Sequence, residues 1–300
     1  MRDFAKPLRT VLYVPANKED WVRKAPKYGA DALILDLEDS VPVPEKETAR
    51  RIVSRLVPEL FSESVTVFVR VNSLDTGLTG EDIKFAMSKC LYAITLPMVR
   101  GPQDIVEVDR MLTDAEKLNG VPEGSVLIDP GLETATGLRD AYEIGRASER
   151  VAHMGAGGGR GGDIARAIGY RWTPEMTETL FLRSKVLLDA RASGSPYPVT
   201  GLWQDIHDHE GLRKFALNSR NLGYTGMTVI HPSHVPIVND IFSPSKEEIE
   251  EWKGLVTAME QVRSVGGAAV SYQGEMVDIA HEKTAIQMLD MARKLGLIVD

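Results

Sequence analysis

The sequence predicts an α/β fold that is built from repeated strand–helix units. Short apolar runs recur along most of the 300 residues, and most gaps between them hold a stretch that is compatible with a helix. Strands that alternate with helices pair in parallel, because each helix returns the chain to the same end of the sheet. The expected strands are residues 10–15, 32–39, 65–72, 93–98, 125–129, 151–156, 197–203 and 227–232.

The gaps between these runs carry helical patterns of different length. Residues 102–118 have apolar side chains at a spacing close to 3.6 residues, and residues 176–192 are long and amphipathic. Shorter helices are expected at residues 20–28, which stop at Gly29, and at residues 211–222. Eight such units in about 230 residues match the size of a (β/α)8 barrel, the TIM barrel. An open doubly wound sheet is the competing topology.

The character of the chain changes after the eighth run. Ser245 and Glu248 have the spacing of a capping box, so a helix is expected to start there and to end near Val265. Residues 268–278 resemble a small hairpin or loop, and residues 281–295 resemble another helix.

We therefore expect two domains. A (β/α)8 barrel over residues 1–240 would carry catalysis, and residues 241–300 would form a C-terminal helical lid extension. The extension is too small and too polar to hold its own core. It should pack on the barrel, cover its mouth or reach a neighbouring subunit.

Composition and charge limit the classes of partner. The net charge is −8 and the isoelectric point is about 5.4, so general nucleic-acid binding is not expected. The single cysteine, Cys90, permits no internal disulfide and fits a reducing compartment. Residues 1–10 lack the apolar core of a signal peptide, and no stretch reaches the length of a membrane span. We expect a cytoplasmic protein that binds no membrane.

Three carboxylates follow the second apolar run, in DALILDLEDSVPVP. Asp36, Glu38 and Asp39 come directly after a strand that should be buried on both faces. The carboxyl ends of parallel strands face the active site in α/β folds, which makes these acids candidates for catalysis. Acidic residues also favour the first turn of a helix, which is the alternative interpretation.

Other expected strand ends carry polar groups as well. Arg70 and Asn72 end the third run, Glu133 follows the fifth, and Asp163 closes the loop after the sixth. Two carboxylates with few histidines nearby favour Mg²⁺, which proteins usually hold with one or two carboxylates plus water and substrate. Arg70 could bind a carboxylate or a developing oxyanion. It could also form a salt bridge to Asp36 or Glu38, or do both.

The loop after the sixth run is GAGGGRGGD. Gly157, Gly159 and Gly162 match the G-x-G-x-x-G fingerprint of dinucleotide-binding proteins. The context is poor, because this is the sixth strand and no acidic residue ends a following strand about 20 residues on. We interpret the loop as one that lets the backbone approach a ligand closely.

Three further polar residues have alternative interpretations. His231 ends the eighth run and is either a general base or a hydrogen-bonded structural residue. Asp205 and Asp208 follow the seventh run. They are either site residues or, as we favour, caps of the helix that follows.

Several motifs together resemble a known family. LRTVLYVPANKED, DALILDLEDSVP, VFVRVN, PGLETATG and VIHPSHVPIVNDIFSPS occur in the same order in the citrate lyase β-subunit family, which includes malyl-CoA and citramalyl-CoA lyases. The C-terminal AVSYQGEMVD is similar to the family's lid segment. The resemblance spans residues 8 to 295. It implies a (β/α)8 barrel, Mg²⁺, a homotrimer or a larger homo-oligomer, and a lyase that cleaves or forms a C–C bond in a 3-hydroxyacyl-CoA.

The resemblance also implies roles for individual residues. Glu133 and Asp163 resemble the family's metal ligands, with Glu133 also close to substrate, and Arg70 resembles its substrate-binding arginine. Glu38 and Asp39 resemble catalytic acids of the family that support this site. A further catalytic residue, Asp278, resembles the lid aspartate that enters a neighbouring subunit's site. The glycine-rich GAGGGRGGD departs from the family pattern, so the substrate stays open.

Three functions are compatible with these features. The first is a lyase acting on a malyl-, citramalyl- or citryl-CoA, giving an acyl-CoA and a 2-oxo acid. The second is a metal-dependent aldolase or thioesterase acting on another 2-oxo acid or CoA ester. The third is a binding or regulatory protein without activity. A basic pocket for the phosphates of CoA would favour the first, and its candidate residues near the first strand are Arg9, Lys18, Arg23 and Lys24.

Overall fold

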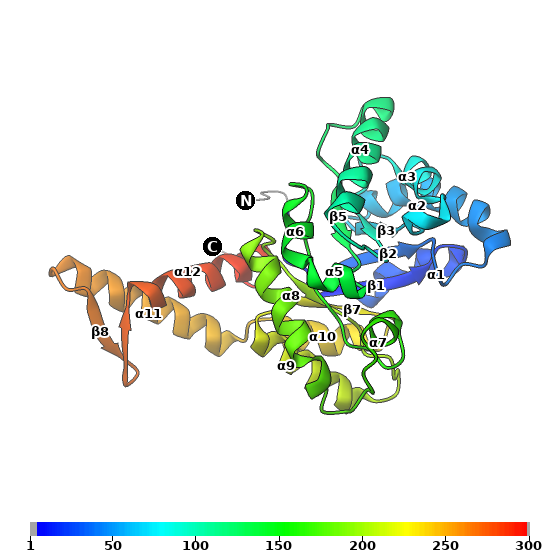
Figure 1. Ribbon diagram of the computed structural model, residues 1–300. Helices are drawn as coiled ribbons and strands as arrows, with labels where there is room; N and C mark the ends of the chain where they lie inside the picture. Colours follow the sequence, from blue (N-terminus) through cyan, green and yellow to red (C-terminus); the bar gives the residue numbers. More distant parts are fainter. Residues whose placement is uncertain (1–4, 299–300) are drawn as a thin grey trace. The chain divides into compact units, whose positions relative to one another are not determined.

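The computed structural model describes residues 5–298, which form two compact units. The first unit ends at Phe242, and the second begins at Ser243. The first unit holds a parallel sheet with helices outside it, and the second holds two helices and a hairpin (Figure 1). Within residues 5–298, none of the helices combines the length and the apolar character that a membrane span needs.

Seven strands form the sheet of the first unit, in the order β5-β4-β3-β2-β1-β7-β6, and all neighbours pair in parallel. Each of them overlaps an apolar run that the sequence marks as a strand, so these predictions are confirmed. The strands are β1 Thr10–Pro15, β2 Ala32–Asp36, β3 Thr66–Arg70, β4 Ala93–Leu96, β5 Leu127–Pro130, β6 Val199–Thr200 and β7 Gly226–Val229.

The expected closed (β/α)8 barrel is wrong, because the sheet is open and curled, with β5 and β6 at its edges. The expected strand at residues 151–156 is reduced to one isolated bridge between Val151 and Ile128. His153 explains why no ladder forms there: its φ of 58° lies in the left-handed region, which a strand cannot contain. Glycines occupy positions 155 and 157–159, shortly after this histidine. The seventh expected strand also shortens, to two residues.

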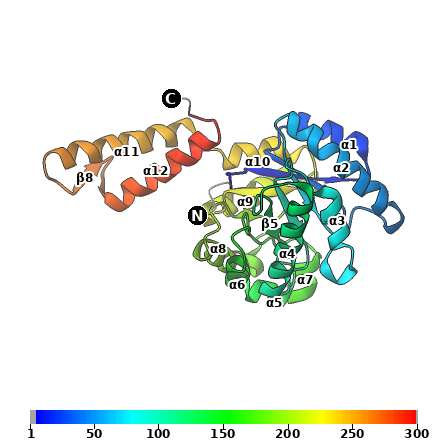
Figure 2. The ribbon, with the colours of Figure 1, turned by 90° about the horizontal axis from the view of Figure 1, so that it is seen from above.

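Ten α-helices connect these strands among the described residues of the first unit. The predicted helix at residues 102–118 is confirmed almost to the residue, and those at 20–28, 176–192 and 211–222 are confirmed with shifted ends. The helices are α1 Glu19–Lys24, α2 Lys46–Ser62, α3 Thr79–Ala86, α4 Pro102–Asn119, α5 Ala135–Arg139, α6 Ala141–Arg146, α7 Asp163–Ile168, α8 Leu180–Ala192, α9 His209–Leu222 and α10 His234–Phe242. Figure 2 shows helices such as α1, α2, α3 and α4 outside the curled sheet, whereas α7 contributes residues to a cavity at the ends of the strands.

The two faces of the sheet bury different cores, because side chains alternate along each strand. Leu33, Leu35 and Val69 point outward into the large cluster shared with the helices. Ile34 and Phe68, one residue away in each strand, belong to a smaller cluster on the inner face. The polar residues at the strand ends continue the inner face, so the sheet aims them at a common space.

The second unit consists of α11 (Lys246–Ser264), the hairpin β8 (Ala269–Tyr272) and β9 (Glu275–Asp278), and α12 (Ile279–Lys294). The predicted capping box is confirmed, because the Ser245 hydroxyl accepts from Glu248 N and the Glu248 carboxylate accepts from Ser245 N. Helices α11 and α12 pack against each other. Ile249, Leu289 and Ala292 form a small core between them, where the sequence analysis expected none.

Candidate functional site

Five inward-facing residues form a single row across the sheet. The strand register pairs Pro15 with Asp36, Asp36 with Arg70, Arg70 with Thr95, and Thr95 with Asp129. All five line the same cavity. Each lies at or next to the carboxyl end of its strand, where α/β folds place their active sites. The register therefore places an arginine, a threonine and two aspartates side by side.

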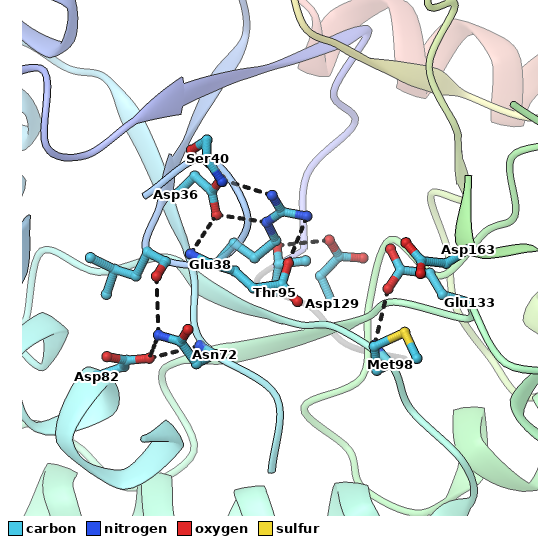
Figure 3. Close-up of polar contacts among 12 residues, drawn as sticks. Asp36, Glu38, Ser40, Asn72, Asp82, Thr95, Met98, Asp129, Glu133 and Asp163 are labelled. Atoms are coloured by element: carbon cyan, nitrogen blue, oxygen red, sulfur yellow. Dashed lines mark hydrogen bonds and ion pairs between the residues drawn. The ribbon is translucent and has the colours of Figure 1, made fainter. Parts of the chain in front are cut away.

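Arg70 is held by two carboxylates. Its Nε and Nη2 donate to the two oxygens of Asp36, both at 2.7 Å, and Nη1 lies 2.9 Å from Glu38 Oε2 (Figure 3). Its guanidinium also lies over the Tyr13 ring, 4.9 Å from the ring centre. The salt bridge that the sequence left open is thus formed. It leaves one face of the arginine lining the cavity, so a substrate role remains compatible with it.

These carboxyl groups have different pKa values because they differ in partners. Burial would raise the pKa of Asp36, but the hydrogen bonds and the charge of Arg70 outweigh burial and hold it below its ordinary value. Burial raises the pKa of Glu38 to about 7, although Arg70 opposes this shift. Asp39 is exposed and lines the cavity. Near neutral pH, Glu38 therefore exchanges a proton more readily than Asp36.

The loop behind Arg70 is fixed by buried polar groups. Leu37 O accepts hydrogen bonds from Lys46 Nζ at 2.8 Å and from Asn72 Nδ2 at 3.0 Å. Asp82 accepts from both the backbone and the side chain of Asn72 and pairs with Arg50 at 2.6 Å. Asn72 thus supports the strand ends and does not line the cavity.

Glu133 and Asp163 bring two carboxylates to the same cavity. Met98 N donates to Glu133 Oε2 at 3.0 Å, which fixes one oxygen (Figure 3). Burial raises the pKa of Glu133, and the nearby charges of Asp163 and Asp39 add to the shift. Asp163 opens α7 and pairs with Arg166 on its own helix. Within residues 5–298, no group of three or more acidic, histidine or cysteine side chains is arranged to hold a metal, so any ion here would rest on this pair.

The cavity has a volume of about 490 Å³, enough for a small acid and part of a larger ligand. Val11, Phe68 and Val199, from the inner core cluster, form apolar parts of its wall. The glycine-rich loop also lines the cavity, with Gly157, Gly158, Gly159 and Gly162. The arrangement suits a ligand with an anionic or oxygen-rich end and a less polar remainder.

The glycine-rich loop approaches its neighbours more closely than side chains would allow. A Cβ on Gly157 would lie 2.9 Å from Gly201 Cα, and one on Gly201 would lie 2.4 Å from Gly157 Cα. A Cβ on Gly158 would lie 2.8 Å from the Thr179 side chain. These contacts explain the glycines by backbone packing beside the cavity. They are not the strand–turn–helix geometry of a dinucleotide site, since no regular strand precedes the loop.

The candidate CoA-binding cations are not brought to the cavity. Arg9 precedes β1 at the opposite end of the sheet and forms an ion pair with Asp31 at 2.6 Å. Lys18 and Lys24 lie at the two ends of α1 and are exposed. Arg23, between them, pairs with Glu19 and Glu59. Lys18 follows the carboxyl end of β1 closely, and Lys24 lies at the far end of α1.

Two further sequence interpretations are resolved by hydrogen bonds. Asp208 caps α9, since its carboxylate accepts from Gly211 N at 2.9 Å, and Asp205 accepts from His207 N at 3.0 Å in the preceding turn. The prediction that these are caps is confirmed for Asp208. His231 bonds to the Ser233 hydroxyl at 2.7 Å and is not among the cavity residues.

Asp278 lies in the second unit, as the N-cap of α12. Its carboxylate accepts from Ala280 N at 2.9 Å and contacts His281 Nδ1 at 2.8 Å. The hydrogen bond from His281 lowers the pKa of Asp278, so the group is ionised near neutral pH. About half of its side chain is exposed. It is accessible to a partner molecule.

Thr95 and Asp129 are two of the polar cavity residues that the sequence analysis did not single out. Thr95 and Asp129 are the last inward-facing residues of β4 and β5. Burial raises the pKa of Asp129 to about 7. The signal was present, because Asp129 ends the run SVLID just as Asp36 ends ALILD. Glu133 follows four residues later in the motif PGLETATG, which is the stronger signal of a site in this segment.

Comparisons with known proteins agree with one another. The family model described as HpcH/HpaI aldolase/citrate lyase matches residues 9–232. The citrate lyase β subunit of Leuconostoc mesenteroides subsp. cremoris is 31% identical over 270 residues, covering 90% of this chain and 88% of the relative. A (3S)-malyl-CoA thioesterase of Cereibacter sphaeroides is 34% identical over 293 residues, covering 97% of each chain.

Solved structures show the same likeness. The protein CitE of Mycobacterium tuberculosis, in complex with magnesium, acetoacetate and coenzyme A, superposes with a TM-score of 0.73 at 26% identity, covering 98% of this chain and 100% of the other. A citrate lyase of Burkholderia xenovorans has a TM-score of 0.82 at 20% identity, covering 99% and 94% of the two chains, which shows a shared fold alone.

Proposed function

Because the chain belongs to the HpcH/HpaI aldolase/citrate lyase family, we propose that it is a Mg²⁺-dependent carbon–carbon lyase. Its substrate would be a 3-hydroxyacyl-CoA such as malyl-, citramalyl- or citryl-CoA, which gives an acyl-CoA and a 2-oxo acid. The observation that carries this proposal is the meeting of Glu133, Asp163 and Arg70 around one cavity of about 490 Å³. CitE is known in complex with magnesium, acetoacetate and coenzyme A, and with magnesium and pyruvate, which is a 2-oxo acid.

The carboxylate pair fits a divalent cation. Glu133 and Asp163 supply hard oxygen donors, which suit Mg²⁺. Burial raises the pKa of Glu133, and repulsion from Asp163 adds to the shift; a bound cation would relieve both costs. When bound, Mg²⁺ would act as a Lewis acid toward the oxygens of the 2-oxo acid half. We propose that Glu133 and Asp163 hold it, and that water and substrate complete its coordination.

Arg70 would stabilise negative charge that develops on oxygen. Cleavage breaks the bond between C2 and C3 of the acyl chain, removes the proton of the 3-hydroxyl group and leaves the electron pair in a thioester enolate. Asp36 and Glu38 fix the guanidinium by three contacts, so it needs little reorganisation during the reaction. Glu38 and Asp39 are proposed to support this site.

The Arg70→Lys variant is expected to lower kcat by about 100-fold and to raise KM by much less. Lysine cannot reproduce the planar fork that holds both Asp36 oxygens, so charge stabilisation in the transition state is lost. Steady-state kinetics with the active substrate would measure this, and Arg51→Lys, on the exposed face of α2, is the control. An unchanged kcat would leave Arg70 a structural residue only.

A proton must also move during the reaction, and we propose Asp278 for this step. An ionised carboxylate can take the proton of the 3-hydroxyl group in cleavage and return it to C2 of the enolate, which gives the acyl-CoA. The residue belongs to the second unit, so we propose that it acts in the site of a neighbouring subunit in a homotrimer or a larger homo-oligomer. Closure over the substrate would exclude water.

The phosphates of CoA need cationic partners outside the cavity. We propose Lys18 and Lys24, which are exposed at the two ends of α1. Arg9 has no part in this proposal, because Asp31 holds it at the other end of β1. The single cysteine fits a reducing compartment, and we propose a cytoplasmic location.

A thioesterase is the second candidate function. The malyl-CoA thioesterase relative is as similar to this chain as the citrate lyase subunits are, and it covers more of it. In this reaction water attacks the thioester carbonyl, and the products are free CoA and a hydroxy acid.

A turnover screen separates the two functions. Malyl-, citramalyl- and citryl-CoA are incubated with the protein and Mg²⁺, and 2-oxo acids and free thiol are measured in parallel. The lyase releases glyoxylate, pyruvate or oxaloacetate without free thiol, whereas a thioesterase releases thiol without a 2-oxo acid. Thiol as the sole product would replace the lyase by the thioesterase, and the absence of both products would reject both functions for these three substrates.

A further inference from the structure

One acidic residue in the cavity has no part in the proposed reaction. Asp129 lies on the inner face of β5, next to Thr95 in the row that also contains Arg70. Thr95 Oγ1 donates to Asp129 Oδ2 at 3.0 Å (Figure 3). Arg70 is directed to Asp36 and Glu38 instead. Among residues 5–298, no arginine or lysine forms an ion pair with Asp129.

The surroundings of Asp129 make its position costly. Phe68, Val11 and Tyr13 belong to or pack against the inner apolar cluster and line the cavity beside it. A carboxyl group in such a place is destabilising unless its oxygens are hydrogen-bonded. The hydrogen bond from Thr95 is the one that the described residues offer to this carboxyl. Its remaining acceptor capacity is therefore available to a ligand in the cavity.

The same cavity contains the carboxylates proposed to hold the metal. Asp129 ends the inward face of β5, and Glu133 lies in the loop that directly follows the strand. The charge of Glu133 contributes to the raised pKa of Asp129. A ligand held at Glu133 and Asp163 would therefore share the cavity with the Asp129–Thr95 pair.

We propose that Asp129 and Thr95 form a subsite for a hydroxyl group on C3 of the 2-oxo acid half of the substrate, an inference that rests on the proposed function. The hydroxyl group of the substrate can donate to Asp129. It can also accept from Thr95 when the Thr95 hydroxyl rotates toward it. A methyl group would offer the carboxyl no hydrogen bond beyond the one from Thr95. A second carboxylate would be repelled by Asp129 and Glu133 in their ionised forms. The substrate class is thus a 3-hydroxyacyl-CoA whose 2-oxo acid product carries a neutral hydroxyl substituent.

Binding of small 2-oxo acids tests this subsite without catalysis. Calorimetric titrations of the Mg²⁺-loaded protein would compare 3-hydroxypyruvate with 2-oxobutyrate, in which a methyl group replaces the hydroxyl group. Pyruvate and oxaloacetate complete the set. We expect 3-hydroxypyruvate to bind about 10- to 100-fold more tightly than 2-oxobutyrate, the effect of one hydrogen bond to a charged group.

Two variants test whether Asp129 and Thr95 cause the preference for 3-hydroxypyruvate. Asp129→Leu should reduce the ratio between the two ligands to less than about 3-fold, and the isosteric Thr95→Val should reduce it in part. Both should still bind pyruvate, which shows that they are folded. The exposed Asp114 provides the control, since Asp114→Leu should keep the ratio of the unmodified protein. If Asp129→Leu does not fold, the subsite is tested by the affinity ratio of 3-hydroxypyruvate to 2-oxobutyrate. This ratio is then compared between the unmodified protein and Thr95→Val.

The outcomes separate this inference from the proposed function. If pyruvate, 2-oxobutyrate and 3-hydroxypyruvate bind with equal affinity, the lyase proposal stands and the subsite is refuted. Preference for oxaloacetate also refutes it, because Asp129 would then be protonated and donate to a carboxylate. If no 2-oxo acid binds in the presence of Mg²⁺, the proposed function fails and the subsite fails with it.

Discussion

Glu133→Gln and Asp163→Asn are each expected to abolish Mg²⁺ binding and to lower turnover by at least about 1,000-fold, with the fold intact. Each change removes one of only two carboxylates proposed to hold the ion, and a 1,000-fold loss corresponds to about 4 kcal/mol of transition-state stabilisation. Chelator treatment of the unmodified protein should reproduce the loss. Calorimetric Mg²⁺ titration and steady-state kinetics measure the two effects.

Thermal melting distinguishes loss of the ion from loss of the fold. Without Mg²⁺ the Glu133→Gln variant should melt no lower than the unmodified protein, because a buried carboxyl with a raised pKa is replaced by a neutral amide. Added Mg²⁺ should stabilise the unmodified protein and leave the variant unchanged. The exposed Glu143 provides the control, since Glu143→Gln should behave like the unmodified protein. Full activity of either site variant in chelator-treated buffer would reject the metal assignment.

The second large effect is expected at Asp278, where Asp278→Asn should reduce turnover to background with Mg²⁺ affinity nearly unchanged. The substitution is selective, because asparagine is as good an N-cap as aspartate and should keep the first turn of α12. What the amide cannot do is accept a proton. Kinetics and Mg²⁺ titration on the same preparation measure both properties. Activity within tenfold of the unmodified protein would remove Asp278 from the mechanism.

A mixing experiment tests whether Asp278 acts in a neighbouring subunit. Asp278→Asn and Glu133→Gln subunits are combined under conditions that reassort oligomers, and reassortment is verified with differently tagged chains. Mixed oligomers contain interfaces where an intact metal site meets an intact Asp278, so part of the activity should return. Verified mixtures that stay inactive, or an active monomer, would contradict the shared site.

The strands were predictable because they are short and almost wholly apolar. ALILD and TVFVR become β2 and β3 with five residues each, and both are buried on both faces. The run at residues 151–156 looked equally apolar, yet His153 adopts a left-handed backbone conformation there. Conformations of single residues are invisible to periodicity. The closure of the sheet depended on this one run, and the expected barrel failed with it.

The site was predictable where polar groups end strands. Arg70, Glu133 and Asp163 line one cavity, although 93 positions separate the first from the last. The ion pair between Arg70 and Asp36 needed the register, which pairs the two residues directly across β2 and β3. Arg9 was misplaced because nearness in sequence to a strand does not tell which end of the strand a side chain occupies. The role of Asp278 depends on a partner chain, which one sequence does not specify.

The contact between Gly157 and Gly201 limits which substitutions this protein can accept beside the cavity. Each glycine occupies the space that a side chain on the other would need. Enlarging either residue alone pushes two backbones apart beside the cavity, and the second substitution does not repair the first. Gly162, in the same loop, has open space around its Cα and is free of this restriction. The outer part of the loop therefore has room for larger side chains, whereas Gly157 and Gly201 have none.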